Sequence, residues 1–265
     1  MLRVSMLGPF GMTCDGRRVK LQLMQITIIL ALLSAHGPVE RDNLIRKVWP
    51  SHAVADKWPT LRRHLSRINS ALEEADGNIA MLITEPAGPA RTFQIREDVC
   101  TDAQEFQHLC ADGAMALRDG RCDEASTLLR KALKLWGPVS ETGPAPLRCV
   151  AGYGFADSYI AELRNQYKTA TLGAMKAAIS TGWHEQSIPG LRKLDLWYPG
   201  QTGIGELLAI ALYRSGTMEE AGQVLQSAIS TACKAGVGFQ RLRGLQEQIL
   251  NDTFPRRGPL PDEFA

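Results

Sequence analysis

The sequence predicts two domains of different fold class, an α+β domain over residues 1–98 and an all-α domain over residues 102–250. Short apolar segments bounded by turn residues alternate with helical patterns as far as about residue 95. From about residue 102 the pattern is helical throughout, and one stretch of it recurs 96 residues later. Residues 251–265 are rich in proline, so we expect a disordered tail there.

Short strands are expected at the start of the chain. Leu2–Leu7 is apolar, and Gly11–Cys14 leads through Asp15-Gly16 into Val19–Leu21. An Asp-Gly pair between two strand-like segments is typical of a hairpin turn. The chain therefore begins with a small antiparallel sheet.

Three helices are expected next. The first covers about Met24–Ala35, where length and flanking residues outweigh a β-branched cluster that mildly disfavours a helix. The second covers about Arg41–Val48, and residues 51–57 are interpreted as a polar linker. The third covers Trp58–Asp76, with Pro59 in its first turn, where a missing N–H costs nothing.

Two strands, Ala80–Thr84 and Thr92–Ile95, follow the third helix, and the connector between them carries Arg91. A hairpin with a basic tip directly after such a helix is typical of a wing, which contacts phosphates or an adjacent minor groove. Strands, three helices and a final hairpin form the order of a winged helix of the OmpR/PhoB type.

The third helix is the predicted recognition helix. Leu61, Leu65, Ile68 and Leu72 form one narrow apolar seam, which leaves arginines and short polar residues on the other faces. Such a face can contact phosphates and reach base edges in a major groove. An ordinary surface helix with a solvated charged face is the alternative. The predicted DNA-binding residues are Thr60, Arg62, Arg63, His64, Ser66, Arg67, Asn69, Ser70 and Arg91.

The charge distribution favours this interpretation. The net charge is only +2, but residues 1–95 hold 12 Lys and Arg against 8 Asp and Glu, whereas residues 96–265 hold 18 against 20. Seven cations and two acids lie within residues 41–67. A basic excess next to the recognition helix is what nucleic-acid binding requires.

The second domain contains an internal repeat. Residues 116–135, ALRDGRCDEASTLLRKALKL, align with residues 212–231, LYRSGTMEEAGQVLQSAIST. A further turn glycine, Gly182, precedes Gly216 by 34 residues, which is the period of tetratricopeptide repeats. The sequence therefore predicts a tetratricopeptide-like array of paired helices, although chance likeness between amphipathic helices is an alternative.

No pattern in the sequence supports catalysis, a metal site or a cofactor. Gly200–Glu206 lacks the lysine of a phosphate loop, and the five histidines show no ligand spacing. The six cysteines fit no zinc or disulfide framework, and are expected to be reduced. We therefore expect a non-enzymatic protein. We find neither a signal-peptide pattern nor an apolar run long enough for a membrane span, so we expect it in the cytoplasm, at the nucleoid, without a membrane partner.

The chain resembles the Streptomyces antibiotic regulatory protein family over about residues 2–250. The stretches that carry the resemblance are VSMLGPFGMTCDGRRVKL, TLRRHLSRINSAL, AMALRDGRCDEASTLLRKALKLWGP and LLAIALYRSGTMEEAGQVLQ. This family joins an OmpR/PhoB-type winged helix to a tetratricopeptide-like bacterial transcriptional activation domain. The resemblance implies an activator that binds short direct repeats in double-stranded promoter DNA near the −35 region, beside a second copy of itself. It also implies recruitment of RNA polymerase, and control of a biosynthetic gene cluster.

The sequence departs from the family pattern in the recognition helix and in the wing. Asn69 and Ser70 stand where the family usually has two arginines, and Arg62 and Arg63 add two arginines earlier in the helix. The alternative function is a non-enzymatic repeat scaffold that uses both domains for protein contacts. If the chain is an activator, a fragment that ends near Thr101 is expected to fold and bind DNA without activating transcription.

Overall fold

The structure is a computed structural model that describes residues 1–35, 37–76, 83–84, 92–236 and 238–261. It forms two compact units. The first unit comprises Met1–Phe106, Leu135–Ser140 and Pro144–Asn165, and the second comprises the remaining segments, up to the C-terminus. The compact units therefore do not divide at residues 98–102, where the sequence places the domain boundary, and that boundary stays a prediction.

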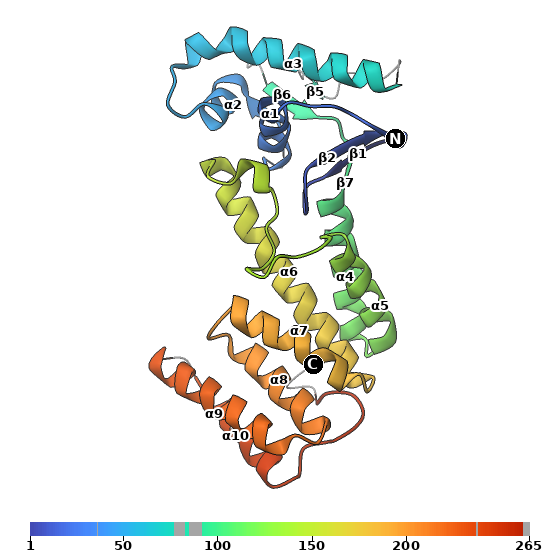
Figure 1. The fold of residues 1–265 in the computed structure, drawn as a ribbon, viewed down its shortest axis with the longest axis vertical. Helices are drawn as coiled ribbons and strands as arrows, with labels where there is room; N and C mark the ends of the chain where they lie inside the picture. The colour runs from blue at the N-terminus through green and yellow to red at the C-terminus, as the bar shows by residue number, and fades with distance from the viewer. Residues whose placement is uncertain (36, 77–82, 85–91, 237, 262–265) are drawn as a thin grey trace. The chain divides into compact units, whose positions relative to one another are not determined.

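A four-stranded sheet opens the first unit (Figure 1). Its order is β3 (Arg17–Arg18), β2 (Gly11–Cys14), β1 (Leu2–Ser5) and β7 (Cys100–Thr101). Neighbours are antiparallel except β1 and β7, which run parallel. Asp15 and Gly16 both have positive φ, as a tight two-residue hairpin needs. The structure confirms the predicted hairpin, although its second strand begins and ends earlier than Val19–Leu21.

Three helices and a second sheet complete the fold up to residue 95. The helices are α1 (Leu23–Leu33), α2 (Arg41–Val48) and α3 (Val54–Asp76). The second sheet has the order β4 (Val39–Glu40), β6 (Thr92–Ile95) and β5 (Ile83–Thr84), and both of its pairs are antiparallel. The winged-helix assignment stays a prediction, because the connector at residues 85–91 lies outside the described residues.

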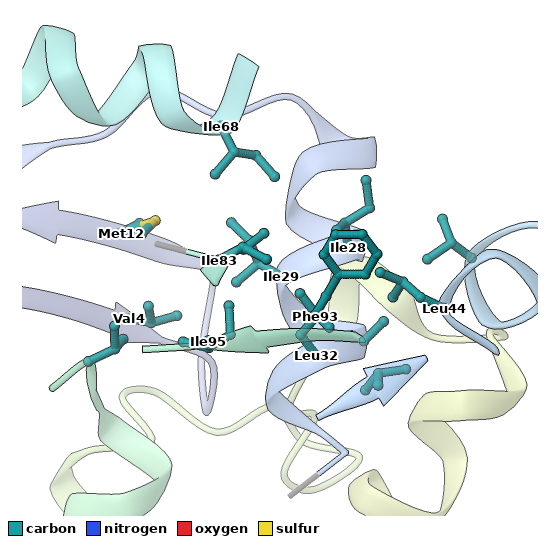
Figure 2. Packing of buried hydrophobic residues seen from close by; sticks show 14 of the residues in the cluster. Val4, Met12, Ile28, Ile29, Leu32, Leu44, Ile68, Ile83, Phe93 and Ile95 are labelled. Atoms are coloured by element: carbon teal, nitrogen blue, oxygen red, sulfur yellow. The ribbon is translucent and has the colours of Figure 1, made fainter. Parts of the chain in front are cut away.

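A single apolar cluster fixes these elements, and Figure 2 shows how side chains from helices and strands meet in it. Ile28 and Ile29 of α1 are fully buried at its centre, so tertiary packing outweighs the weak helix preference of their β-branched side chains. Ile68 points from α3 into the cluster, and Phe93 and Ile95 enter it from β6. The sheets and helices therefore hold α3 by its apolar side.

The beginning of α3 differs from the prediction. The helix begins at Val54, so residues 54–57 are not a linker, and Pro59 is inside the helix rather than in its first turn. Val54 and Trp58 pack against the apolar cluster, which extends the helix through a stretch that is polar in sequence. Proline in a helix interior costs about 3 kcal/mol relative to alanine, since it removes a backbone hydrogen bond.

From residue 102 onward the described part of the chain is almost entirely helical. Its helices are α4 (Asp102–Arg118), α5 (Cys122–Lys134), a short 3-10 turn η1 (Arg148–Val150), α6 (Gly154–Ser180), α7 (His184–Trp197), α8 (Thr202–Arg214), α9 (Met218–Lys234) and α10 (Gln240–Leu250). Gly120, Gly182 and Gly216 have positive φ in the turns after α4, α6 and α8, as the repeat predicts. Every residue of α8 from Ile204 to Arg214 is buried, because α7, α9 and α10 surround it. No helix among the described residues combines the length and apolarity that crossing a bilayer needs.

The prediction of a disordered tail is wrong for residues 251–261. Phe254 and Leu260 are buried in the cluster of the second unit. The buried guanidinium of Arg214 donates hydrogen bonds to the carbonyl oxygens of Pro255 and Gly258. Proline content alone indicates disorder only when a segment has nothing to bury, and here two apolar side chains and a buried cation fix the segment.

The Tyr213 hydroxyl supplies a further anchor that can be tested. It lies 2.5 Å from Asp252 Oδ1 and 3.0 Å from the carbonyl oxygen of Phe254. Tyr213→Phe should lower the free energy of unfolding by about 1–2 kcal/mol, the usual range for a lost hydrogen bond that leaves a buried acceptor unpaired. Urea denaturation measures the change. Tyr153→Phe is the control, since the Tyr153 hydroxyl has no hydrogen bond among the described residues, and equal effects of both substitutions would contradict the assignment.

Candidate nucleic-acid interface

The predicted recognition helix is seated as its periodicity requires. Leu61 and Ile68 are fully buried, Leu72 is 1% exposed, and Leu65 packs at the edge of the same cluster. These four side chains turn one narrow side of α3 toward the core. The rest of the helix surface is left for solvent or for a ligand.

The structure brings eight of the nine predicted contact residues together on α3. Arg62, Arg63, Ser66, Arg67 and Ser70 are exposed. Thr60, His64 and Asn69 are half-buried on the flanks between this face and the seam. The ninth, Arg91, lies outside the described residues, so the structure neither joins it to the others nor separates it from them.

The charges on α3 are divided along its axis. Lys57, Arg62, Arg63 and Arg67 lie in the first four turns beside a single exposed acid, Asp56, whereas the exposed Glu73 and Glu74 lie in the last two turns. A polyanion is attracted to the first part and repelled by the second. The exposed face between residues 59 and 70 is therefore the part of α3 that suits a nucleic acid.

His64 is the perturbed titratable group of this helix. Its ring centroid lies 6.4 Å from that of Trp49, and its Nδ1 is buried without a hydrogen-bond partner among the described residues. Burial lowers the pKa of His64, and the neighbouring charges of Arg63 and Arg67 lower it further. His64 is therefore neutral at pH 7, and its ring can donate or accept one hydrogen bond without adding to the positive charge.

A pH dependence of stability follows from the lowered pKa of His64. The unfolded chain binds this proton more readily than the folded one, so stability is complete above about pH 6.5 and is lost as pH falls below it. Wild type should therefore lose more stability between pH 7 and 5.5 than His64→Gln does, as thermal denaturation at each pH will show. His108→Gln, an exposed position on α4, should behave as wild type. Identical pH profiles for wild type and His64→Gln would contradict the burial of this ring.

Sequence reasoning missed a second group of side chains beside the start of α3. The Arg41 guanidinium lies 5.5 Å from the centre of the Trp58 ring, and its Nε donates to Asp42 Oδ1 at 2.6 Å. Trp58 in turn packs against Phe93, with ring centroids 6.3 Å apart. Arg41 is thus oriented at the first residue of α2, close to the basic half of α3. The available signal was its place in the basic stretch 41–67, which by itself does not say which cations are held in position.

The described residues contain no cluster of three or more metal-ligating side chains. A cavity of about 290 Å³ lies in the second unit, between residues 199–201 with the start of α8 on one side and α9 on the other. Asp195, Gln201 and Val224 line it together with small or hydroxyl-bearing residues, and no lysine or arginine is among them. Its lining therefore lacks the cation that a phosphate group usually pairs with.

Comparison with known proteins gives one family and several relatives. A model of the bacterial transcriptional activator domain matches residues 101–250. The chain is similar to the regulatory protein AfsR of Streptomyces griseus, 28% identical over 200 residues that cover 74% of this chain and 19% of that protein. It is also similar to the transcriptional regulator RedD of Streptomyces coelicolor, 25% identical over 234 residues that cover 83% of this chain and 61% of that protein. The chain thus spans about a fifth of the length of AfsR.

A solved structure shares the fold of nearly the whole chain. Mycobacterium tuberculosis EmbR, in complex with a low-affinity phosphopeptide, matches with a TM-score of 0.82 over 98% of this chain and 66% of its own. The two sequences are 23% identical, so this likeness shows the fold alone.

Proposed function

Because the chain belongs to the family of the bacterial transcriptional activator domain, we propose that it is a DNA-binding transcriptional activator. The observation that carries this proposal is the exposed basic face of α3, a helix whose apolar seam is buried in the core. In the sequence this helix precedes the residues that match the family. The names of the similar proteins, a regulatory protein and a transcriptional regulator, support it. No catalytic role, metal or cofactor forms part of the proposal.

The proposed contacts follow the exposure of the side chains on α3. Arg63 and Arg67 lie on the exposed face opposite the seam, where they reach base edges in the major groove. Arg62, Ser66 and Ser70 flank them and bond to phosphates or base edges. The half-buried residues Thr60, His64 and Asn69 contact the DNA backbone next to them through their accessible polar atoms.

Arg91 is proposed to contact a phosphate or the minor groove from the wing. Such a contact depends little on sequence, so Arg91→Ala should weaken binding to specific and to random duplexes by similar factors. The slope of log affinity against log salt should become shallower by about one unit. Titrations by fluorescence anisotropy at several salt concentrations measure both quantities. A loss confined to the specific duplex would contradict this role.

The second domain is proposed to supply the protein contacts. Stacked helix pairs offer extended surfaces for a partner, and the family resemblance suggests RNA polymerase or a second copy bound at an adjacent direct repeat. The same resemblance suggests promoter sites near the −35 region, control of a biosynthetic gene cluster, and a place in the cytoplasm at the nucleoid.

Selection from a random-sequence duplex pool by the full chain tests the proposal. A DNA-binding activator should enrich a defined sequence, and its affinity should fall about a hundredfold between about 50 and 200 mM salt if four phosphates are contacted. The selected duplex, placed upstream of a −35 element, should then increase transcription by purified RNA polymerase when the protein is added. No enriched sequence together with salt-independent binding would favour the alternative, a repeat scaffold without a DNA partner.

A further inference from the structure

Pro59 occupies an unexpected position on the exposed face of α3. It lies inside the helix and is exposed. Arg63 follows it by four residues and Ser66 by seven, so at about 100° per residue the three side chains form one row. The predicted contact residues of the sequence included Arg63 and Ser66 but not Pro59.

The stability of the fold does not explain this proline. It lacks the N–H that would bond to the carbonyl of Ala55, and its exposed ring belongs to none of the apolar clusters among the described residues. A helix whose first residue is Val54 has no need of a proline at Pro59 to begin. Positions that break a local rule without a packing gain are often functional.

The chemistry of the ring restricts what it can recognise. It has no charge and no hydrogen-bond donor, so it suits neither a phosphate nor a polar base edge. In the major groove, the one apolar group on the base edges is the C5-methyl of thymine, which proteins read through small apolar side chains. Because the ring is rigid, holding it there costs little side-chain entropy.

We propose that Pro59 reads the C5-methyl group of a thymine next to the base that Arg63 contacts. This inference rests on the proposed function and adds to it a preference for thymine at one position of the site. It also explains why the recognition helix keeps a residue that weakens it.

The test uses the full chain and the duplex that it selects from a random-sequence pool. Each thymine of that duplex is replaced in turn by uracil, which removes only the methyl group. Wild type should lose about fourfold in affinity at one position, the effect of one buried methyl group. Pro59→Gly should bind the thymine duplex about fourfold more weakly than wild type, and should not distinguish thymine from uracil at that position.

Pro189→Gly is the matched control, because Pro189 is also an exposed proline inside a helix, in α7. It should keep both the affinity and the fourfold effect of uracil. Glycine disfavours a helix less than proline does, so neither variant endangers folding. If Pro189→Gly reproduces the loss, the effect belongs to proline in helices generally and the inference is wrong.

The remaining outcomes separate the inference from the proposed function. A selected sequence in which no uracil substitution matters, or in which wild type and Pro59→Gly lose affinity equally, overturns the methyl contact and leaves DNA recognition in place. Failure of wild type to select any sequence overturns both.

Discussion

Replacing both Arg63 and Arg67 by alanine should lower the affinity for the selected duplex by about a hundredfold or more. Both side chains are exposed on the basic part of α3, opposite its buried seam. An arginine paired with guanine is worth about 1–3 kcal/mol, and two such pairs therefore account for a loss of this size. Fluorescence anisotropy at fixed salt measures the change.

A control of equal charge is needed for this pair, because two lost cations weaken binding to any polyanion. Arg118→Ala with Lys131→Ala removes two exposed cations from α4 and α5. That double variant should bind within about twofold of wild type, since α4 and α5 carry none of the proposed contact residues and salt screens exposed charges that do not touch the ligand. Unchanged affinity for the α3 double variant would show that this helix does not contact the bases of the selected duplex.

Asp102→Ala should lower the free energy of unfolding by about 3 kcal/mol. Asp102 is buried at the first residue of α4, where its carboxylate accepts hydrogen bonds from Met6 N–H at 2.8 Å and from Leu7 N–H at 3.2 Å. Both residues are 1% exposed, so alanine leaves two buried amide groups without an acceptor, at about 1–3 kcal/mol each. Burial raises the pKa of Asp102, and relief of that cost offsets part of the loss.

Urea denaturation of the full chain measures the effect of Asp102, with Asp112→Ala as the control at an exposed position of the same helix. Asp102→Asn keeps one acceptor oxygen but turns an NH2 group toward the other amide, so its stability should fall between those of wild type and Asp102→Ala. A loss below about 0.5 kcal/mol for Asp102→Ala would mean that this carboxylate does not fasten the first strand.

The same contacts change what is expected of a short fragment. The carbonyl of Met6 accepts a hydrogen bond from Leu147 N–H, and Asp102 belongs to the same compact unit, so a fragment that ends at Thr101 lacks two partners of the segment directly after β1. We therefore expect Met1–Thr101 to be poorly folded, in contrast to the expectation from sequence. The complete compact unit reaches Asn165, and circular dichroism of Met1–Thr101 and Met1–Asn165 compares the two fragments.

The sequence determined those features of the protein that depend on near neighbours. The seam Leu61, Leu65, Ile68 and Leu72 predicted which side of α3 is buried, because helical periodicity fixes the relative directions of side chains three and four residues apart. The Asp15-Gly16 hairpin and the repeat glycines were predicted for a similar reason, since positive φ is a property of single residues. The exposure of Arg63, Ser66 and Arg67 followed from the seam.

The tertiary structure decided what depends on residues far apart in the chain. Val54 and Trp58 pack against the apolar cluster, and this packing extends α3 toward its N-terminus. The polar residues next to them in the sequence do not indicate such a contact. The segment after Leu250 is held in place because Arg214, some 40 residues earlier, donates hydrogen bonds to its carbonyl oxygens. Asp102 likewise accepts a hydrogen bond from Met6, almost a hundred residues before it, at the end of the first strand. The position of Pro59 within the helix, and with it the inferred thymine contact, emerged only from that packing. Such contacts depend on burial and hydrogen-bond pairing across the whole fold. Local sequence patterns therefore do not predict which distant residue will be the partner.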